Sequence, residues 1–165
     1  MGFREYLEVY VKGRQNMSAC IFIAADVPLP EVRPSQDYPL HINLDTGIIS
    51  DGGADDNYSL LTFDEVDLYC RKKYGVYLEL HQYTDGRARQ IIEYIRTALL
   101  QTDCVEIWNV WLLGYWEYDE RPYIQKSTIH MEELTVDDMK EIINAENWDN
   151  KDKSRPSFYC LEITR

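Results

Sequence analysis

The chain of 165 residues has 17 basic and 29 acidic side chains, which gives a formal net charge of −12. This charge repels phosphate groups and therefore argues against nucleic acids and anionic membranes as partners. Hydrophobic residues make up 45% of the chain and aromatic residues 13%, too large a share for a disordered acidic protein. The length fits one globular domain over residues 1–165, and no apolar run approaches the ~20 residues of a membrane span.

The first third of the sequence predicts strands and extended connections. Residues 5–11 alternate between apolar and polar side chains, and together with residues 19–25 they predict a hairpin. Four prolines in residues 28–39 predict an extended connection without a helix. Alternation predicts a short third strand over residues 40–44, and the glycines and acids of residues 45–57 predict a surface loop. The carboxylates of this loop lack the spacing of a calcium-binding EF-hand.

Two helices are predicted in the middle of the chain. Thr62 and Glu65 match a capping box, which predicts a helix to about Lys73 that Gly75 terminates. A second helix is predicted over residues 85–101, because isoleucine, leucine and alanine side chains form one stripe at helical spacing.

Strands and a third helix are predicted in the remainder. Residues 76–83 alternate as in a strand, although a helix remains an alternative. Residues 104–113 are apolar on both faces, which predicts a central strand, and residues 123–131 are expected to pair with it antiparallel. Residues 135–143 repeat the capping pattern of a helix, and residues 157–164 predict a last strand. These elements predict an α+β fold, a mostly antiparallel sheet of about five to seven strands with three helices packed on it.

The sequence contains no recognisable catalytic or metal-binding motif. Its four cysteines are isolated and lie in apolar stretches, so we expect buried thiols and no cofactor. The sequence shows no secretory signal, so we expect a cytoplasmic location. The histidines lie far apart, and none neighbours a nucleophile. We therefore expect a protein that is not an enzyme. A small enzyme with a site around His81 or His130 is the alternative.

Acidic and aromatic residues concentrate in the C-terminal half. Residues 103–152 hold 13 acidic and 4 basic side chains, a net charge of −9, against −3 elsewhere. Tryptophan and tyrosine interleaved with acids are typical of protein-binding surfaces, and an acidic surface steers a basic partner. The alternatives are that the acids only maintain solubility and that the aromatic connection of residues 114–121 folds back onto the sheet. The predicted binding residues are Glu106, Tyr115, Trp116, Glu117, Tyr118, Asp119, Glu120, Glu132, Glu133, Asp137 and Asp138.

Three segments carry a family resemblance: Ile91 to Arg96 (IIEYIR), Cys104 to Gly114 (CVEIWNVWLLG) and Ile129 to Met139 (IHMEELTVDDM). Together they resemble small α+β immunity proteins of bacterial polymorphic-toxin and contact-dependent inhibition systems. The resemblance implies a non-catalytic inhibitor that neutralises a cognate toxin by covering its active site or an essential surface. Many such toxins are basic nucleases, which agrees with the acidity of this chain. The alternative is a structural or regulatory module that forms a homodimer through the same aromatic region, residues 106–123.

Overall fold

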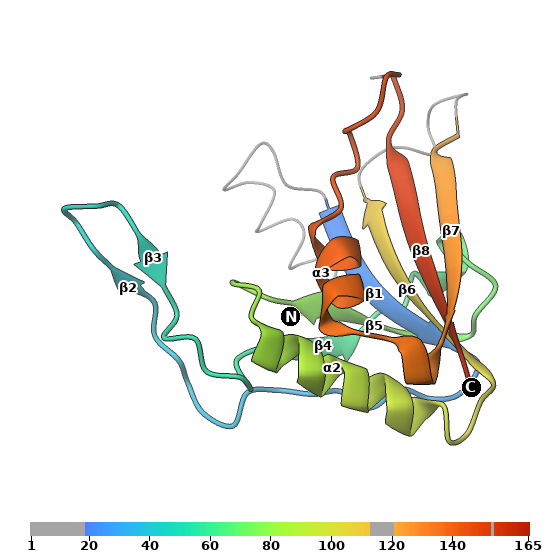
Figure 1. The fold of residues 1–165 in the computed structure, drawn as a ribbon, viewed down its shortest axis with the longest axis horizontal. Helices are drawn as coiled ribbons and strands as arrows, with labels where there is room; N and C mark the ends of the chain where they lie inside the picture. The colour runs from blue at the N-terminus through green and yellow to red at the C-terminus, as the bar shows by residue number, and fades with distance from the viewer. Residues whose placement is uncertain (1–18, 113–120, 153) are drawn as a thin grey trace.

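The computed structural model describes residues 19–112, 121–152 and 154–165. Six strands form a mixed sheet in the order β4-β5-β1-β6-β8-β7, and β2 and β3 form a separate ribbon (Figure 1). The strands are β1 Ala19–Ala25, β2 His41–Ile42, β3 Ile49–Ser50, β4 Ser59–Thr62, β5 Tyr74–Glu79, β6 Cys104–Trp111, β7 Tyr123–His130 and β8 Ser157–Thr164. The α-helices are α2 Asp85–Ala98 and α3 Val136–Asn144, and single 3-10 turns span Val66–Leu68 and Met131–Glu133.

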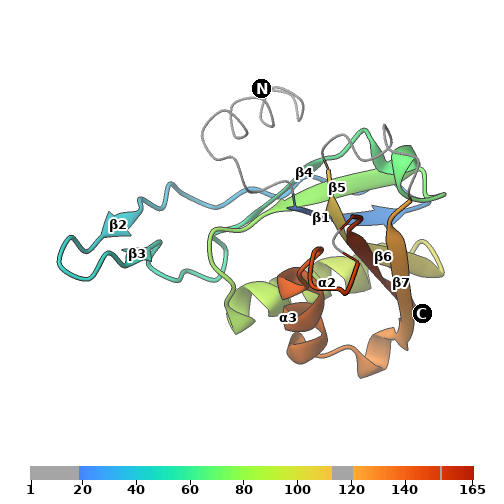
Figure 2. The ribbon, with the colours of Figure 1, turned by 90° about the horizontal axis from the view of Figure 1, so that it is seen from above.

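The two α-helices cover one face of the sheet (Figure 2). Ile91 and Ile95 of α2 and Met139 of α3 are buried against strand residues such as Ile107 and Ile163. Among the residues that the structure describes, no helix is both long enough and apolar enough to span a membrane.

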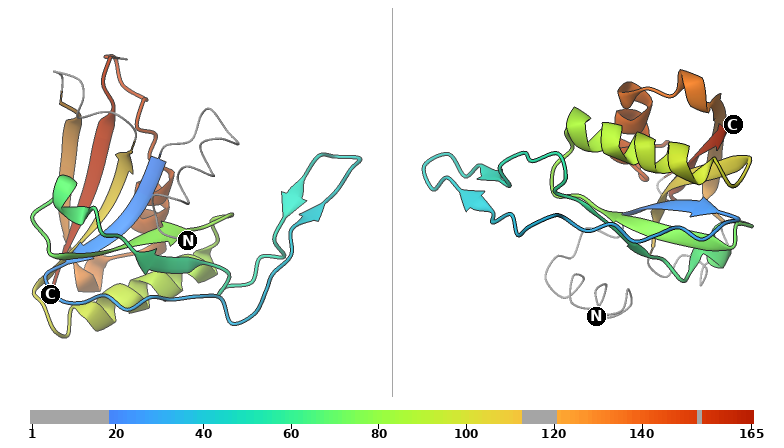
Figure 3. Two further views of the ribbon diagram at one scale, coloured as in Figure 1. Left: turned by 180° about the vertical axis from the view of Figure 1, so that it is seen from behind. Right: turned by 90° about the horizontal axis from the view of Figure 1, so that it is seen from below.

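The opposite face of the sheet is covered by the segment that follows β4 (Figure 3). Phe63 and Val66 are buried there against Phe22, Trp108 and Phe158 from three different strands. The Phe22 and Phe63 ring centroids lie 4.7 Å apart, and those of Phe22 and Trp108 lie 6.2 Å apart in a stacked arrangement. The sheet therefore has a buried core on both faces.

The structure confirms the α+β class and most of the predicted elements. Strands β1 and β8 have the predicted bounds, and β6 lies inside the sheet between β1 and β8. Helix α2 begins after Thr84, whose side chain accepts a hydrogen bond from the Arg87 amide. Helix α3 begins with a capping box between Thr135 and Asp138.

The predicted helix from Thr62 to Lys73 is wrong, and the part of the chain that the structure describes holds two α-helices instead of three. Thr62 ends β4, paired with Val76, and its amide and hydroxyl both donate to Glu31 Oε1. The hydroxyl therefore forms a hydrogen bond with Glu31 and does not cap a helix. Gly75 lies within β5, where an added Cβ would meet Val66 Cβ at 3.2 Å and the Phe63 carbonyl oxygen at 3.3 Å. Glycine thus lets the turn at Val66 pack on the sheet.

The predicted antiparallel pairing of β6 and β7 is also wrong. Strand β8 lies between them, and β7 pairs with β8 in parallel, with Tyr123 opposite Ser157 and His130 opposite Thr164. Parallel neighbours need a long crossover, which the segment containing α3 supplies. The sequence marks this segment as a helix, but it does not say which strands the helix connects.

The remaining predictions concern the N-terminal part and the aromatic connection. The predicted strand over residues 40–44 is reduced to His41–Ile42, and the predicted loop supplies its partner Ile49–Ser50. Residues 28–39 contain no helix and form one isolated bridge, between Val32 and Leu60. The predicted strand over residues 5–11 and the connection 113–120 lie outside the described residues.

Candidate functional site

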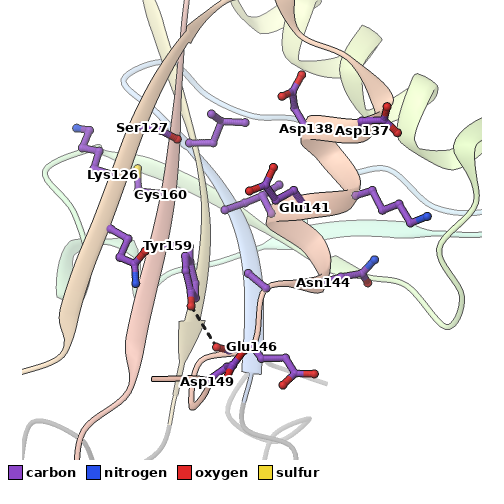
Figure 4. A pocket seen from close by; sticks show the side chains of 15 residues that line it. Lys126, Ser127, Asp137, Asp138, Glu141, Asn144, Glu146, Asp149, Tyr159 and Cys160 are labelled. Atoms are coloured by element: carbon purple, nitrogen blue, oxygen red, sulfur yellow. Dashed lines mark hydrogen bonds between the residues drawn. The ribbon is translucent and has the colours of Figure 1, made fainter. Parts of the chain in front are cut away.

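An acidic groove runs between α3 and the parallel strands β7 and β8 (Figure 4). Its volume is about 1010 Å³. The floor includes Gln125 and Ser127 of β7 and Tyr159 and Leu161 of β8, and α3 forms the wall. Five carboxylate side chains line it: Asp137, Asp138, Glu141, Glu146 and Asp149.

The start of α3 is fixed by its capping box. The Asp138 carboxylate accepts hydrogen bonds from the Thr135 amide at 2.8 Å and from the Thr135 hydroxyl at 2.6 Å. The Asp138 amide in turn donates to Thr135 Oγ1 at 3.3 Å. Asp138 therefore stabilises the first turn of the helix, whereas Asp137 and Glu141 are exposed and lie one helical turn apart.

Buried amides fix the other end of α3. Asn109 of β6 donates from Nδ2 to the carbonyl oxygens of Ile142 and Ala145, each at 2.9 Å. These bonds satisfy carbonyl groups that a helix leaves without partners at its C-terminus. Asn147 is also buried and donates to the Ser157 carbonyl at 2.8 Å, so the segment carrying Glu146 and Asp149 is tied to β8.

The tyrosine on the floor of the groove contacts the same segment. The Tyr159 hydroxyl donates to the Glu146 carbonyl at 3.2 Å, drawn as a dashed line in Figure 4. Hydrogen bonds with the sheet thus hold the C-terminal end of α3 and the segment that follows it, whereas the capping box orders the start of the helix.

The charge of the groove is strongly negative because its nearest lysine on the sheet is engaged elsewhere. Figure 4 shows Lys126 pointing away from α3. Its ammonium lies 2.8 Å from Glu162 Oε2 and 3.4 Å from Glu106 Oε1, and the hydrogen bond that Lys126 donates to Glu162 raises the pKa of Lys126. Lys140 is the other lysine at the groove, so the five carboxylates outnumber the cations. Such a groove favours a basic ligand.

Strand β7 leaves the side of this groove open. It is the last strand of the sheet, its outer edge pairs with no strand among the described residues, and seven of its eight residues are exposed. An unpaired strand edge offers backbone amides and carbonyls to another chain.

Of the predicted binding residues that the structure describes, two line the groove, Asp137 and Asp138. Glu106 is 7% exposed and lies on the other face of the sheet, where it accepts from Trp108 Nε1 at 2.8 Å. Glu132 and Glu133 are exposed on the 3-10 turn before α3 and do not line the groove. The other predicted residues, Tyr115, Trp116, Glu117, Tyr118, Asp119 and Glu120, lie outside the described residues.

Sequence reasoning missed three carboxylates of the groove, Glu141, Glu146 and Asp149. The spacing of Asp137 and Glu141 was a signal, since residues four apart share a helix face. Glu146 and Asp149 follow the helix, and no periodicity indicates where they point. Their place depends on Asn147 and on the parallel pairing of β7 with β8, which the sequence did not reveal.

Among the described residues, neither His81 nor His130 forms a hydrogen bond with a serine, threonine or cysteine side chain. The His130 Nδ1 accepts from the Glu132 amide at 3.3 Å and caps the 3-10 turn, which is a structural role. His81 is exposed in the connection before α2. The thiols are free, and burial raises the pKa of Cys20, Cys70, Cys104 and Cys160. This disfavours nucleophilic thiolates.

One group of potential metal ligands exists within the described ranges: Cys104, Glu106 and Glu162, whose ligand atoms lie within 4.8 Å of one another. The Lys126 ammonium already binds both carboxylates. The hydrogen bond from Lys126 lowers the pKa of Glu162. The lysine therefore supplies the positive charge beside these carboxylates.

No protein-family model, no curated protein and no solved structure matches this chain.

Proposed function

We propose that this chain is a non-catalytic protein-binding domain whose acidic groove accepts a basic segment of a partner protein. One observation carries the proposal: five carboxylates line a groove of about 1010 Å³ next to an open strand edge. Carboxylates accept hydrogen bonds from lysine and arginine, and the net charge of −12 raises the rate at which a basic partner is encountered.

The shape of the groove supports an extended ligand segment. A strand added to the free edge of β7 would widen the groove floor, with alternate side chains on the face of the sheet that carries α3. Backbone hydrogen bonds to a strand edge supply affinity, and charged side chains supply specificity, in many peptide complexes.

In its specific form the proposal is an immunity-type inhibitor, and the partner is a basic toxin domain. An inhibitor of this kind acts by covering a functional surface, for which it needs a complementary surface and no catalytic group. The carboxylates of α3 supply such a surface. The resemblance of residues 129–139 to immunity proteins includes Asp137 and Asp138.

The experiment is a pull-down from lysate of the source organism with three immobilised forms of the chain. The groove variant is Asp137→Lys with Glu141→Lys, which leaves the capping residue Asp138 intact. The control variant is Asp64→Lys with Asp67→Lys, two exposed acids of which the first precedes the 3-10 turn Val66–Leu68 and the second lies within it. Both variants have a net charge of −8, so they differ only in where the charge has changed.

We expect the wild type and the control variant to retain the same basic protein, and the groove variant to lose it. Retention should weaken between low and roughly physiological salt, because salt screens exposed charges. Equal loss in both variants would mean that net charge alone matters, which would contradict the groove. The inhibitor form has a further test: the retained protein should arrest growth when expressed alone, and co-expression of this chain should restore growth.

A further inference from the structure

The hairpin of β2 and β3 extends away from the body of the molecule as an arm, which we define as residues 38–51. Both views in Figure 3 show it projecting past the sheet and the helices. Ile42 pairs with Ile49 and His41 with Ser50 across the arm. Its position makes the arm a surface of its own, separate from the groove.

Exposed apolar side chains are concentrated on this arm. Ten large hydrophobic side chains are exposed in the described part of the chain, and five of them lie within residues 40–49, with exposures between 50% and 91%. These five are Leu40, Ile42, Leu44, Ile48 and Ile49. Exposed apolar residues scattered singly are ordinary, but a contiguous group indicates an interaction site.

The tip of the arm has a defined turn. The Asn43 amide donates to the Ile48 carbonyl at 2.9 Å, and the Gly47 amide donates to the Asn43 carbonyl at 2.8 Å. The Asn43 side chain accepts from the amides of Asp45 and Thr46 at 3.0 and 3.1 Å. Gly47 has a φ of +68°, the left-handed conformation that closes such a turn.

The base of the arm is anchored on both strands. Asp51 and Arg87 form a buried ion pair, with Arg87 Nη1 2.8 Å from Asp51 Oδ2 and Nη2 3.0 Å from Oδ1. On the other side, Asp56 accepts from the Tyr38 hydroxyl at 2.5 Å and from Ser35. The body therefore holds the arm out in one direction, and a preformed element of this kind loses less entropy on binding.

The small number of charged residues on the arm indicates which kind of partner covers it. Between residues 40 and 50 the one charged residue is Asp45, so the arm offers a basic partner no row of carboxylates. Two copies of the chain repel each other through their charges of −12, but contact at the arms keeps the acidic bodies apart. Homodimer interfaces are also more apolar and less charged than other interfaces, as the arm is.

We propose that two copies of this chain form a homodimer through their arms, related by a two-fold axis. Ile42 and Ile49 share one face of the ribbon because they are paired, and Leu40 shares it because it lies two residues before Ile42. A two-fold axis packs this face against the same face of the second copy. The proposal is independent of the groove, and it uses a different surface from the aromatic region 106–123.

The test is sedimentation of the full chain from about 1 to 100 µM, in the range where weak dimers dissociate. The arm variant is Ile42→Thr with Ile49→Thr, since threonine keeps the preference for strands and removes the apolar contact. The control variant is Leu100→Thr with Ile124→Thr, two exposed apolar side chains of the body. Circular dichroism checks that each variant is folded.

The wild type and the control should form dimers, and the arm variant should dissociate at least about 100-fold more readily, because four apolar side chains leave the interface. Dimerisation should also strengthen as salt rises, since salt screens the repulsion between the bodies. A wild type that stays monomeric throughout, or an arm variant that dimerises like the control, overturns the proposal.

Discussion

Replacing Arg87 by methionine should destabilise the fold more than any exposed substitution on the same helix. Arg87 is fully buried, and its guanidinium makes four hydrogen bonds: two to Asp51, one to the Ala54 carbonyl at 2.9 Å and one to the Gln82 carbonyl at 2.6 Å. Arg87→Met removes all four and leaves the Asp51 carboxylate buried without its cation. Removing one partner of a buried ion pair costs about 3–5 kcal/mol.

The loss of unfolding free energy can be measured by urea denaturation, with tryptophan fluorescence and circular dichroism as the probes. The matched control is Arg89→Met, an exposed arginine two residues further along α2, which should change the free energy of unfolding by less than about 0.5 kcal/mol. The double variant Arg87→Met with Asp51→Leu removes both charges and should recover part of the loss. A loss below about 1 kcal/mol for Arg87→Met, or additive effects of the two single variants, would refute this reasoning.

The same ion pair predicts the direction of a pH effect. Hydrogen bonds from Arg87 lower the pKa of Asp51, against the opposing effect of burial. The stabilisation is therefore complete above the ordinary carboxyl pKa of about 3.9 and is lost as the pH falls through the lowered value. The free energy of unfolding of the wild type should decline more steeply below about pH 4 than that of Asp51→Leu.

Other variants test how the groove is built and how the thiols are protected. Asn109→Leu leaves the last carbonyls of α3 without donors and should cost about 1–3 kcal/mol in urea unfolding; an unchanged midpoint would contradict this role. Thr135→Ala removes the capping box of α3 and should cost about 1 kcal/mol in the same assay, whereas a larger loss in Thr128→Ala on exposed β7 would argue against it. Cys20 and Cys160 are buried, so in the native protein at about pH 8 they should escape alkylation until urea is added; peptide mass spectrometry reads this out, and early labelling would show that they are accessible.

Much of the fold could be predicted from the sequence where local pattern and tertiary contact agree. The stripe of isoleucines predicted α2 because that stripe is what the sheet buries. The two apolar faces of residues 104–113 predicted a central strand because each face packs on a separate core. In both cases the spacing of apolar residues along the chain matches the faces that the folded protein buries.

The errors arose where one residue had two possible partners. The Thr62 hydroxyl could cap a helix or bond to Glu31, and the distance along the chain to Glu31 hides the second choice from a local pattern. Similarly, β7 could pair with the strand before it or with the strand after α3. Local propensity does not decide between such alternatives, since long-range packing supplies the difference in free energy.

The candidate site was predictable in charge but not in shape. The acid-rich residues 103–152 include Asp137 and Asp138 of α3, which line the groove. The groove itself depends on β7 lying beside β8 in parallel and on the buried amides of Asn109 and Asn147. Likewise, the alternation of residues 40–44 predicted a strand, but it did not indicate that both of its faces would stay exposed on an arm.

The two proposed surfaces are linked through the charge of the whole chain. The groove would bind a basic segment and thereby neutralise part of the −12 charge, whereas the arms would bring two such charges closer together. A basic segment bound in each groove should therefore reduce the repulsion between the bodies and tighten the dimer. By thermodynamic reciprocity the dimer must then bind the basic segment more tightly than the monomer does. This coupling acts through exposed charges, so it should fade as salt rises, even while the apolar contact between the arms persists.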